Sequence, residues 1–429
     1  MLKFSLAVCL SLTLFSLSHA ATYHVLPEAT GTNDGTSWEN AYGPSQLQST
    51  VDTLKPGDLL LIGSGTYEGV SLKISCQGEP QNPIIIRGHN SGAGLPVLKS
   101  SWTIDDPTKG ATAIQLGEKV SHLSISQVQI DGYKMGIVAH PCKTVESRNH
   151  IFFREIDIRN CRHGFYLSDC DDLSLEACRL VRYSKHGFRF EQGCDRVQLK
   201  NCVADCSEAD AEWEKKTELF PFGFNINNGG TPNTQFHLED CTAANNMMPL
   251  QKKRYKNGDG FVMEGNTQDV SLVRCKAIRN QDGGYDLKVD DISLKDCIGI
   301  GNGRQVRIWT TGTLENCYFG YGGTGLWNNG GPLSVNQCTF YKLGVAAMTD
   351  DKAKQKITLS NCVIADCTKT YKKTASGGGV ILDDTLVEEA DSSPSNDAKP
   401  ATRPVPEWDG VGSPTAPETI SGKGYQPLP

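Results

Sequence analysis

The stretch NGDGFVMEGNTQDVSLVRCKAIRNQDGGYDLK, from Asn257 to Lys288, nearly repeats itself and decides the fold of this chain. Its opening GDGFVME returns about one repeat later as DGGYDLK, and each copy alternates apolar and polar residues. Alternation with a period of two is typical of β-strands, and the Gly, Asn and Asp residues between them are typical of tight turns. The stretch therefore predicts short strands that recur along the chain.

The same unit can be followed from His163 onward, as an aromatic-led strand and then a second apolar strand that ends in cysteine. The cysteines that end these units are Cys178, Cys202, Cys241, Cys275, Cys297, Cys317, Cys338 and Cys362. The last five are separated by 22, 20, 21 and 24 residues, with no helical pattern between them. Such short strands at such a period predict an all-β fold, a right-handed parallel β-helix.

The 16 cysteines of the chain allow two interpretations. An exported protein with many cysteines would normally contain disulfides. In a stack of coils, however, equivalent side chains lie about 4.8 Å apart, so the repeated cysteines would form one internal ladder. We therefore favour reduced, buried, structural cysteines over disulfides.

The ends of the chain differ from the repeats in composition. Residues 1–20, MLKFSLAVCLSLTLFSLSHA, are typical of a signal peptide cleaved after Ala20, which predicts a secreted protein, extracellular or periplasmic. Residues 21–382 are predicted to form the β-helix domain, with a cap and first coils at 21–150 and the main coils at 151–382. A short capping helix is expected near Gln46–Leu54. Residues 383–429 are rich in Pro, Ser and acidic residues, and are predicted to be a disordered tail.

The composition also restricts the partners. The formal net charge of -7 disfavours nucleic acid, because phosphate binding needs a basic surface. After the signal peptide no apolar stretch is long enough to span a membrane. The chain is expected to be a monomer, and an acidic polysaccharide remains possible if a metal ion or a local basic patch holds it.

Alternation predicts which side chains face inward and which face outward. The inward column holds Phe165, Phe188, Phe224, Phe261, Tyr285, Val306 and Leu326. The first outward column holds Tyr166, Arg189, Asn225, Val262, Asp286, Arg307 and Trp327. The second outward column, two residues further on, holds Ser168, Glu191, Asn227, Glu264, Lys288 and Trp309.

The outward columns suggest a binding face for a sugar chain. Exposed tryptophans beside carboxylates are unusual without a ligand, although a solvated strand face with mixed charges is the ordinary alternative. The residues predicted to bind substrate are Trp309, Trp327, Glu264 and Asn225. His163 and His186, which precede Gly-Phe at the start of two repeats, are interpreted as turn residues.

The pairing of DGF (Asp259–Phe261) with DGGYD (Asp282–Asp286), joined by RCKAIRNQ, resembles the calcium-site region of the pectate lyases of polysaccharide lyase family nine. The resemblance implies a calcium-dependent lyase that cleaves a pectate-like polyuronate by β-elimination. It implies that Asp259, Asp282 and Asp286 bind calcium. Gly283 stands where the family has a fourth aspartate.

The resemblance also implies a catalytic base one coil beyond the aspartates, where the family has lysine and this chain has Arg307. Arginine is nearly always protonated in proteins, so Lys288, on the same face, is the second candidate. A hydrolase of the same fold would instead need a pair of acids, for which Asp286 and Glu264 are candidates. Two further alternatives remain open: an alginate or glycosaminoglycan lyase of the same fold, and a carbohydrate-binding β-helix protein without catalysis.

Overall fold

The computed structural model describes residues 20–143, 148–207, 213, 215–227, 230–248, 257–265, 267–350, 356–373 and 378–389. The predicted signal peptide, up to residue 19, and the predicted tail beyond residue 389 lie outside these residues. Within the described ranges, no helix is long and apolar enough to cross a membrane.

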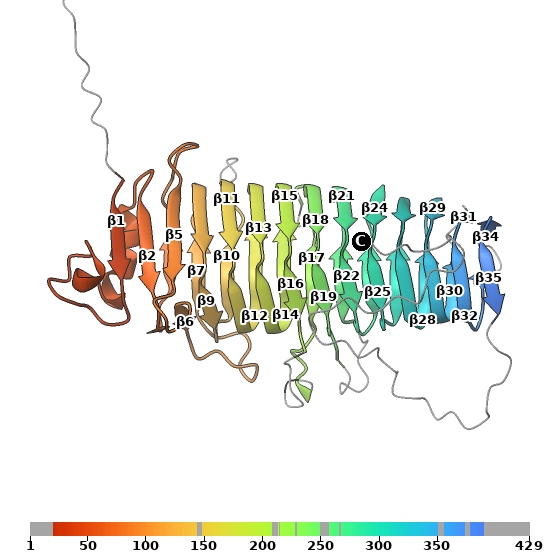
Figure 1. The fold of residues 1–429 in the computed structure, drawn as a ribbon, viewed down its shortest axis with the longest axis horizontal. Helices are drawn as coiled ribbons and strands as arrows, with labels where there is room; N and C mark the ends of the chain where they lie inside the picture. The colour runs from red at the N-terminus through yellow and green to blue at the C-terminus, as the bar shows by residue number, and fades with distance from the viewer. Residues whose placement is uncertain are drawn as a thin grey trace, which may run out of the picture.

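The chain winds into a right-handed parallel β-helix of about 12 turns, as predicted (Figure 1). In the part of the chain that the structure describes, one wall is a sheet of 14 strands, and the strands on the remaining sides form a second, 21-stranded sheet. The first sheet has the order β1 (Thr22–Val25), β2 (Leu59–Gly63), β5 (Ile84–His89), β8 (Ser121–Ser126), β11 (Arg148–Arg154), β13 (Cys170–Glu176), β15 (Asp195–Lys200), β18 (Thr234–Glu239), β21 (Gln268–Val273), β24 (Ile292–Lys295), β27 (Gly312–Glu315), β29 (Leu333–Asn336), β31 (Ile357–Ser360) and β34 (Val380–Asp383).

The second sheet combines two ladders, because four of its strands are long enough to bend around a corner of the coil and take part in both. These long strands are β12 (Asp157–Ser168), β14 (Arg179–Glu191), β28 (Tyr318–Asn328) and β30 (Thr339–Thr349). The other strands are β3 (Thr66–Glu68), β4 (Leu72–Ile74), β6 (Val97–Lys99), β7 (Thr112–Leu116), β9 (Gln129–Asp131), β10 (Met135–Ala139), β16 (Val203–Asp205), β17 (Phe222–Ile226), β19 (Thr242–Ala244), β20 (Asp259–Met263), β22 (Lys276–Ile278), β23 (Gly283–Leu287), β25 (Ile298–Ile300), β26 (Arg304–Ile308), β32 (Val363–Cys367), β33 (Tyr371–Lys373) and β35 (Leu386–Glu389).

A short helical segment covers the N-terminal end, which is red in Figure 1. It consists of η1 (Trp38–Asn40), η2 (Pro44–Gln46) and α1 (Leu47–Thr53). Leu47 and Val51 of α1 are fully buried in the core, so the helix shields the first coil from solvent. The predicted capping helix is therefore present, within one residue of its expected bounds.

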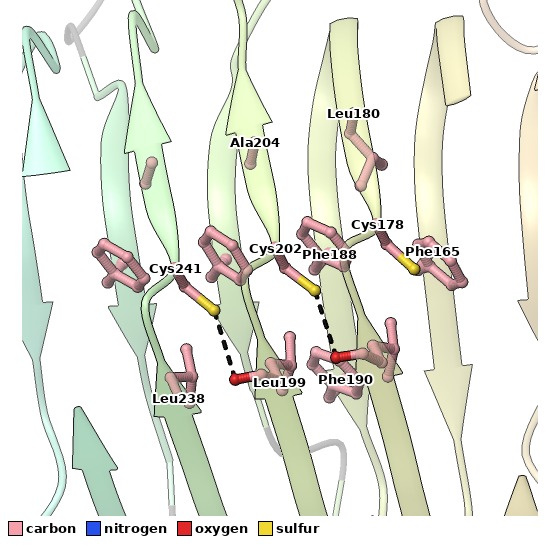
Figure 2. Packing of buried hydrophobic residues seen from close by; sticks show 14 of the residues in the cluster. Phe165, Cys178, Leu180, Phe188, Phe190, Leu199, Cys202, Ala204, Leu238 and Cys241 are labelled. Atoms are coloured by element: carbon pink, nitrogen blue, oxygen red, sulfur yellow. Dashed lines mark hydrogen bonds between the residues drawn. The ribbon is translucent and has the colours of Figure 1, made fainter. Parts of the chain in front are cut away.

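The repeated cysteines follow sharp corners. Each is preceded by one residue with positive φ, such as Arg274 (51°) before Cys275 and Asn316 (50°) before Cys317. The corner turns each thiol into the core, where Cys241 Sγ lies 3.5 Å from the carbonyl oxygen of Leu199 in the preceding coil (Figure 2). All cysteines of the described residues are free, which confirms the prediction of a reduced internal ladder.

The inward aromatic column is confirmed residue by residue. Phe165, Phe188, Phe224, Phe261 and Tyr285 pair in register on neighbouring strands, and all are fully buried. Successive rings stack with centroid separations of 5.4, 4.7, 4.9 and 5.0 Å. This stack fixes the register of the strands that carry the candidate site.

The β-helix extends further than the sequence indicated. Strand β34 ends at Asp383 and β35 spans Leu386–Glu389, where it pairs with β32, so the predicted boundary at residue 382 lies too early. The acidic composition of this segment concealed a strand, because backbone pairing with the preceding coil needs no apolar side chain at every second position.

Candidate active site

The first outward column is confirmed over the coils that carry the predicted site. Val262 pairs with Asp286, Asp286 with Arg307, and Arg307 with Trp327, on strands β20, β23, β26 and β28. Residues that are 20 to 24 positions apart in sequence thereby become direct neighbours across the ladder. Although these side chains point away from the core, all four are buried, because neighbouring side chains cover them.

Three carboxylates of this region meet one guanidinium. Arg307 Nη2 lies 2.9 Å from Asp286 Oδ2 and 3.4 Å from Asp259 Oδ1, while Arg307 Nη1 lies 3.1 Å from Asp282 Oδ2. We call Asp259, Asp282 and Asp286 the three-aspartate cluster; their side chains are between 1% and 8% exposed. The structure thus brings together the three residues that the resemblance had assigned to one metal, but around Arg307.

Asp259 is the most deeply buried member of the cluster. Its Oδ1 atom accepts a hydrogen bond of 2.5 Å from the backbone N–H of Gly283, whereas its Oδ2 atom is buried and has no hydrogen-bond partner. Burial is the first cause that raises the pKa of Asp259, the guanidinium of Arg307 opposes it, and the charges of Asp286 and Asp282 add to it, so that the pKa is about 7. The cluster therefore holds its third negative charge only weakly at neutral pH.

Gly283 allows this close approach. A Cβ atom at this position would lie 2.8 Å from Asp259 Oδ1 and 3.3 Å from Arg307 Nη2. No side chain fits there without moving one of the two. A fourth aspartate at residue 283 is thus incompatible with the arrangement of the other charged groups.

Calcium requires six to eight oxygen ligands around one point. In this structure the point that faces all three carboxylates belongs to the guanidinium of Arg307, a cation that supplies no oxygen. Asn280, two residues before Asp282, is hydrogen-bonded to the amides of Asn246 and Asn302. Among the described residues, no group of three acidic, cysteine or histidine side chains is arranged to hold a metal ion. As they stand, these residues do not fit the calcium site that the resemblance implies.

A ladder of buried amides lies beneath the cluster. Asn246 Nδ2 donates to Asn280 Oδ1 (2.7 Å), and Asn280 Nδ2 donates to Asn302 Oδ1 (2.9 Å). Asn302 Nδ2 donates in turn to Gln305 Oε1 (2.7 Å), and the Tyr183 hydroxyl donates to Asn246 at the other end. The ladder ties together the coils from which the three aspartates and Arg307 project.

The second outward column contains the accessible part of the site. We call Glu264, Lys288 and Trp309, which follow one another on successive coils, the outer row. The Lys288 ammonium contacts Glu264, lies 3.2 Å from Asp286 Oδ2, and sits 5.6 Å from the centre of the Trp309 ring. The side chains of Lys288 and Glu264 are each 32% exposed, whereas that of Asp286 is 4% exposed. A ligand in solvent therefore meets the outer row first.

The neighbouring carboxylates of Asp286 and Glu264 keep Lys288 protonated. Burial alone would lower the pKa of Lys288, but Asp286 and Glu264 outweigh it and raise the pKa above its usual value. These two carboxylates therefore hold Lys288, the second candidate for the base, in its protonated form. In Trp309, the indole N–H donates to Asp286 Oδ1 at 2.6 Å, which holds the ring beside the ammonium.

Two residues predicted to bind substrate are less accessible than expected. Trp327 is only 8% exposed and packs edge-to-face on Trp309, with ring centroids 4.7 Å apart, so it supports that ring instead of presenting its own. Asn225 is 2% exposed, and its Oδ1 atom is buried without a hydrogen-bond partner. Alternation places both side chains on the outer side of the coil but does not reveal that they are buried. Arg304, which sequence reasoning missed, is partly exposed and contacts Asp282.

A second polar cluster lies on the same face, toward the N-terminus. His163 and His186 are buried residues within strands β12 and β14, not turn residues as interpreted from the sequence. Their Nδ1 atoms are 2.8 Å apart, and Arg189 Nη1 lies 2.8 Å from His186 Nε2. Arg189 also contacts Glu191, which accepts a 2.6 Å hydrogen bond from the Tyr166 hydroxyl. The regular recurrence of HGF in the two repeats was the one signal that could have indicated this pairing.

Comparisons with known proteins agree with the fold. The family model described as right handed beta helix region matches residues 108–319, and the model described as chondroitinase B matches residues 43–96. No curated protein matches the chain. Among solved structures, pectate lyase Pel9A is 14% identical, with 86% of this chain and 80% of that chain covered and a TM-score of 0.51. A lacto-N-biosidase from Eubacterium ramulus is 11% identical, with 86% and 68% covered and a TM-score of 0.52. At these identities the likeness concerns the fold: the chain is a right-handed β-helix with a polysaccharide lyase among its structural neighbours.

Proposed function

We propose that this chain is a polysaccharide lyase that cleaves an acidic, pectate-like polyuronate by β-elimination. The observation that carries the proposal is the outer row, in which a carboxylate, an ammonium and an aromatic ring lie side by side above a buried, charge-compensated cluster. An aromatic ring suits the apolar face of a sugar, and an ammonium suits its carboxylate. The lyase among the fold's neighbours supports the same class of reaction.

The chemistry follows from where charge develops. A uronate carries a carboxylate on C5 and the glycosidic oxygen on C4. Loss of the C5 proton builds negative charge on that carboxylate, and the Lys288 ammonium is placed to stabilise it. The electron pair left on C5 then forms the C4–C5 double bond as the C4–O bond breaks, and the leaving oxygen takes a proton from solvent. No water is consumed, so the product ends in an unsaturated sugar.

The choice of base changes once the contacts are considered. Arg307 faces three carboxylates and Lys288 faces two, so both cations are held in the protonated state that stabilises charge. Glu264, which contacts Lys288 and is partly exposed, is the group of the outer row that can accept the C5 proton. Carboxylates act as bases next to carbonyl groups in other enzymes. We assign proton transfer to Glu264, and charge stabilisation to Lys288 and Arg307.

Calcium dependence and secretion remain predictions of the sequence, and no step above uses a metal ion. The same steps would serve an alginate or a glycosaminoglycan. A second candidate function is carbohydrate binding without catalysis. The observation that favours it is that every acid of the three-aspartate cluster is already paired with Arg307, which leaves a polar face without an evident strong base.

The test is the ultraviolet absorbance of unsaturated uronides, measured on polygalacturonate, alginate and a glycosaminoglycan. We expect the signal on one of these polymers, and we expect Glu264→Gln and Lys288→Gln each to lower kcat by about a hundredfold or more, the usual contribution of an acid–base or oxyanion group. Lys295→Gln, on the exposed face of β24, is the matched control and should leave the rate unchanged. If all three polymers give flat traces but still bind, the non-catalytic function is correct and the lyase proposal is wrong.

A further inference from the structure

Two departures from the family pattern, Gly283 and Arg307, lie close together in the folded chain. A Cβ at residue 283 would lie 3.3 Å from Arg307 Nη2, so the missing fourth aspartate leaves the space that the guanidinium uses. We propose that Arg307 is the resident cation of the three-aspartate cluster and takes the place that the resemblance gives to calcium. The proposal concerns the same site as the proposed function, but it does not depend on lyase activity.

The geometry of the guanidinium suits this role. Arg307 projects from β26 and reaches back over one coil to Asp282 and Asp286, and over two coils to Asp259. The two terminal nitrogens of its planar guanidinium contact different acids: Nη1 contacts Asp282, and Nη2 contacts Asp286 and Asp259. Carboxylates this deeply buried need a compensating charge, and one side chain of the same domain supplies it to all three.

Arg307 and a divalent cation would exclude each other. A metal held by the same three carboxylates would lie where the guanidinium lies, and two cations at that separation repel strongly in a buried site. Removal of the guanidinium would leave three buried carboxylates with too little positive charge, which is the condition under which acidic sites gain calcium affinity. We therefore expect that the cluster does not bind calcium in the native chain, and that it binds calcium once residue 307 carries no charge.

The experiment measures calcium binding and stability, not activity. Purified native chain, Arg307→Gln and the control Arg304→Gln are each melted with a chelator and with millimolar calcium chloride. We expect the native Tm to be the same in both conditions. Arg307→Gln should melt several degrees lower in chelator and regain much of the loss in calcium. Arg304→Gln, which removes an exposed contact to Asp282, should show no calcium response.

Terbium luminescence gives a second readout, because Trp309 lies beside the cluster and can sensitise a bound ion. We expect Arg307→Gln to bind terbium at least about tenfold more tightly than the native chain, with displacement by calcium. Arg307→Lys, which keeps one charge without the fork, should lie between the two. A native chain that binds calcium tightly, or an Arg307→Gln variant with no gain over it, would overturn the proposal. The native arm decides the question even if Arg307→Gln does not fold.

Discussion

The histidine pair shows how strongly position in the stack controls a single residue. His163 and His186 lie in neighbouring coils with ring centroids 4.8 Å apart. Burial is the first cause that lowers the pKa of each well below its usual value, and the positive charges of Arg162, Arg189 and Lys185 lower it further. Glu191 and Glu218 pair with two of these arginines without reversing the effect. Both imidazoles are therefore neutral in the folded chain at neutral pH.

This neutrality predicts a loss of stability in mild acid. In the unfolded chain each histidine takes up a proton near pH 6.5, while in the folded chain it does so only at lower pH. The stability that the pair contributes is present above about pH 6.5, and about 1.4 kcal/mol per histidine is lost for each unit below it. Denaturant titrations between pH 7.5 and pH 5 should show this slope. It corresponds to the uptake of about one proton per histidine when the chain unfolds. His186→Phe, whose ring can stack on Phe222, should have a shallower slope; an equal slope would rule out His186 as a source.

At the scale of the strand, alternation predicted the columns correctly, but not what covers them. Period two fixed which of Asp286, Arg307 and Trp327 point away from the core, and the ladder confirms their register. It could not show that they are buried, because burial depends on side chains of neighbouring coils. Nor could it show that Arg307 pairs with three acids, since that depends on side-chain reach across two coils. The sequence showed that the residues of the outer row form one column, but it did not show how far each of them is exposed to solvent.

The aromatic stack should carry much of the stability of the central coils. Phe224 lies between Phe188 and Phe261, and its removal would leave a cavity in the middle of the column. We expect Phe224→Ala to lower the free energy of unfolding by about 3–5 kcal/mol. Phe222→Ala, two residues earlier on the same strand, removes a partly buried ring and should cost clearly less. Urea denaturation compares the two; equal costs would mean that the fully buried ring of the stack contributes no more than a partly buried one.

For the whole molecule, the sequence predicted the architecture because the same pattern of strands and corners recurs in coil after coil. The cysteine spacing, the alternation and the Gly, Asn and Asp corners all favour one coil after another, and the structure has about 12. The C-terminal end was misplaced because the last strands lack that repetition. The charge network around Arg307 was not predictable for the same reason, since it occurs once.

The cysteine ladder predicts how the intact protein reacts with thiol reagents. Of the described cysteines, only Cys76 and Cys142 are partly exposed, and all the others are buried. In native buffer we expect slow labelling at these two positions, and full labelling only in denaturant. The Cys76→Ser, Cys142→Ser double variant should show almost no native labelling at the other cysteines that the structure describes. Disulfide-linked peptides among the repeat cysteines, found by mass spectrometry without reduction, would contradict the reduced ladder.

Each side-chain amide of the ladder beneath the site has one defined orientation. Asn246 and Asn280 each donate from the NH₂ group to the amide oxygen of the asparagine in the coil that follows, whereas Asn302 donates to Gln305 three residues further on. The NH₂ groups of Asn280 and Asn302 also donate to the backbone carbonyls of Ala243 and Ala277, so neither amide can turn over without placing its oxygen against a carbonyl oxygen. The backbone therefore fixes the orientation of each amide, and loss of one amide would remove hydrogen bonds that join its coil to both neighbours.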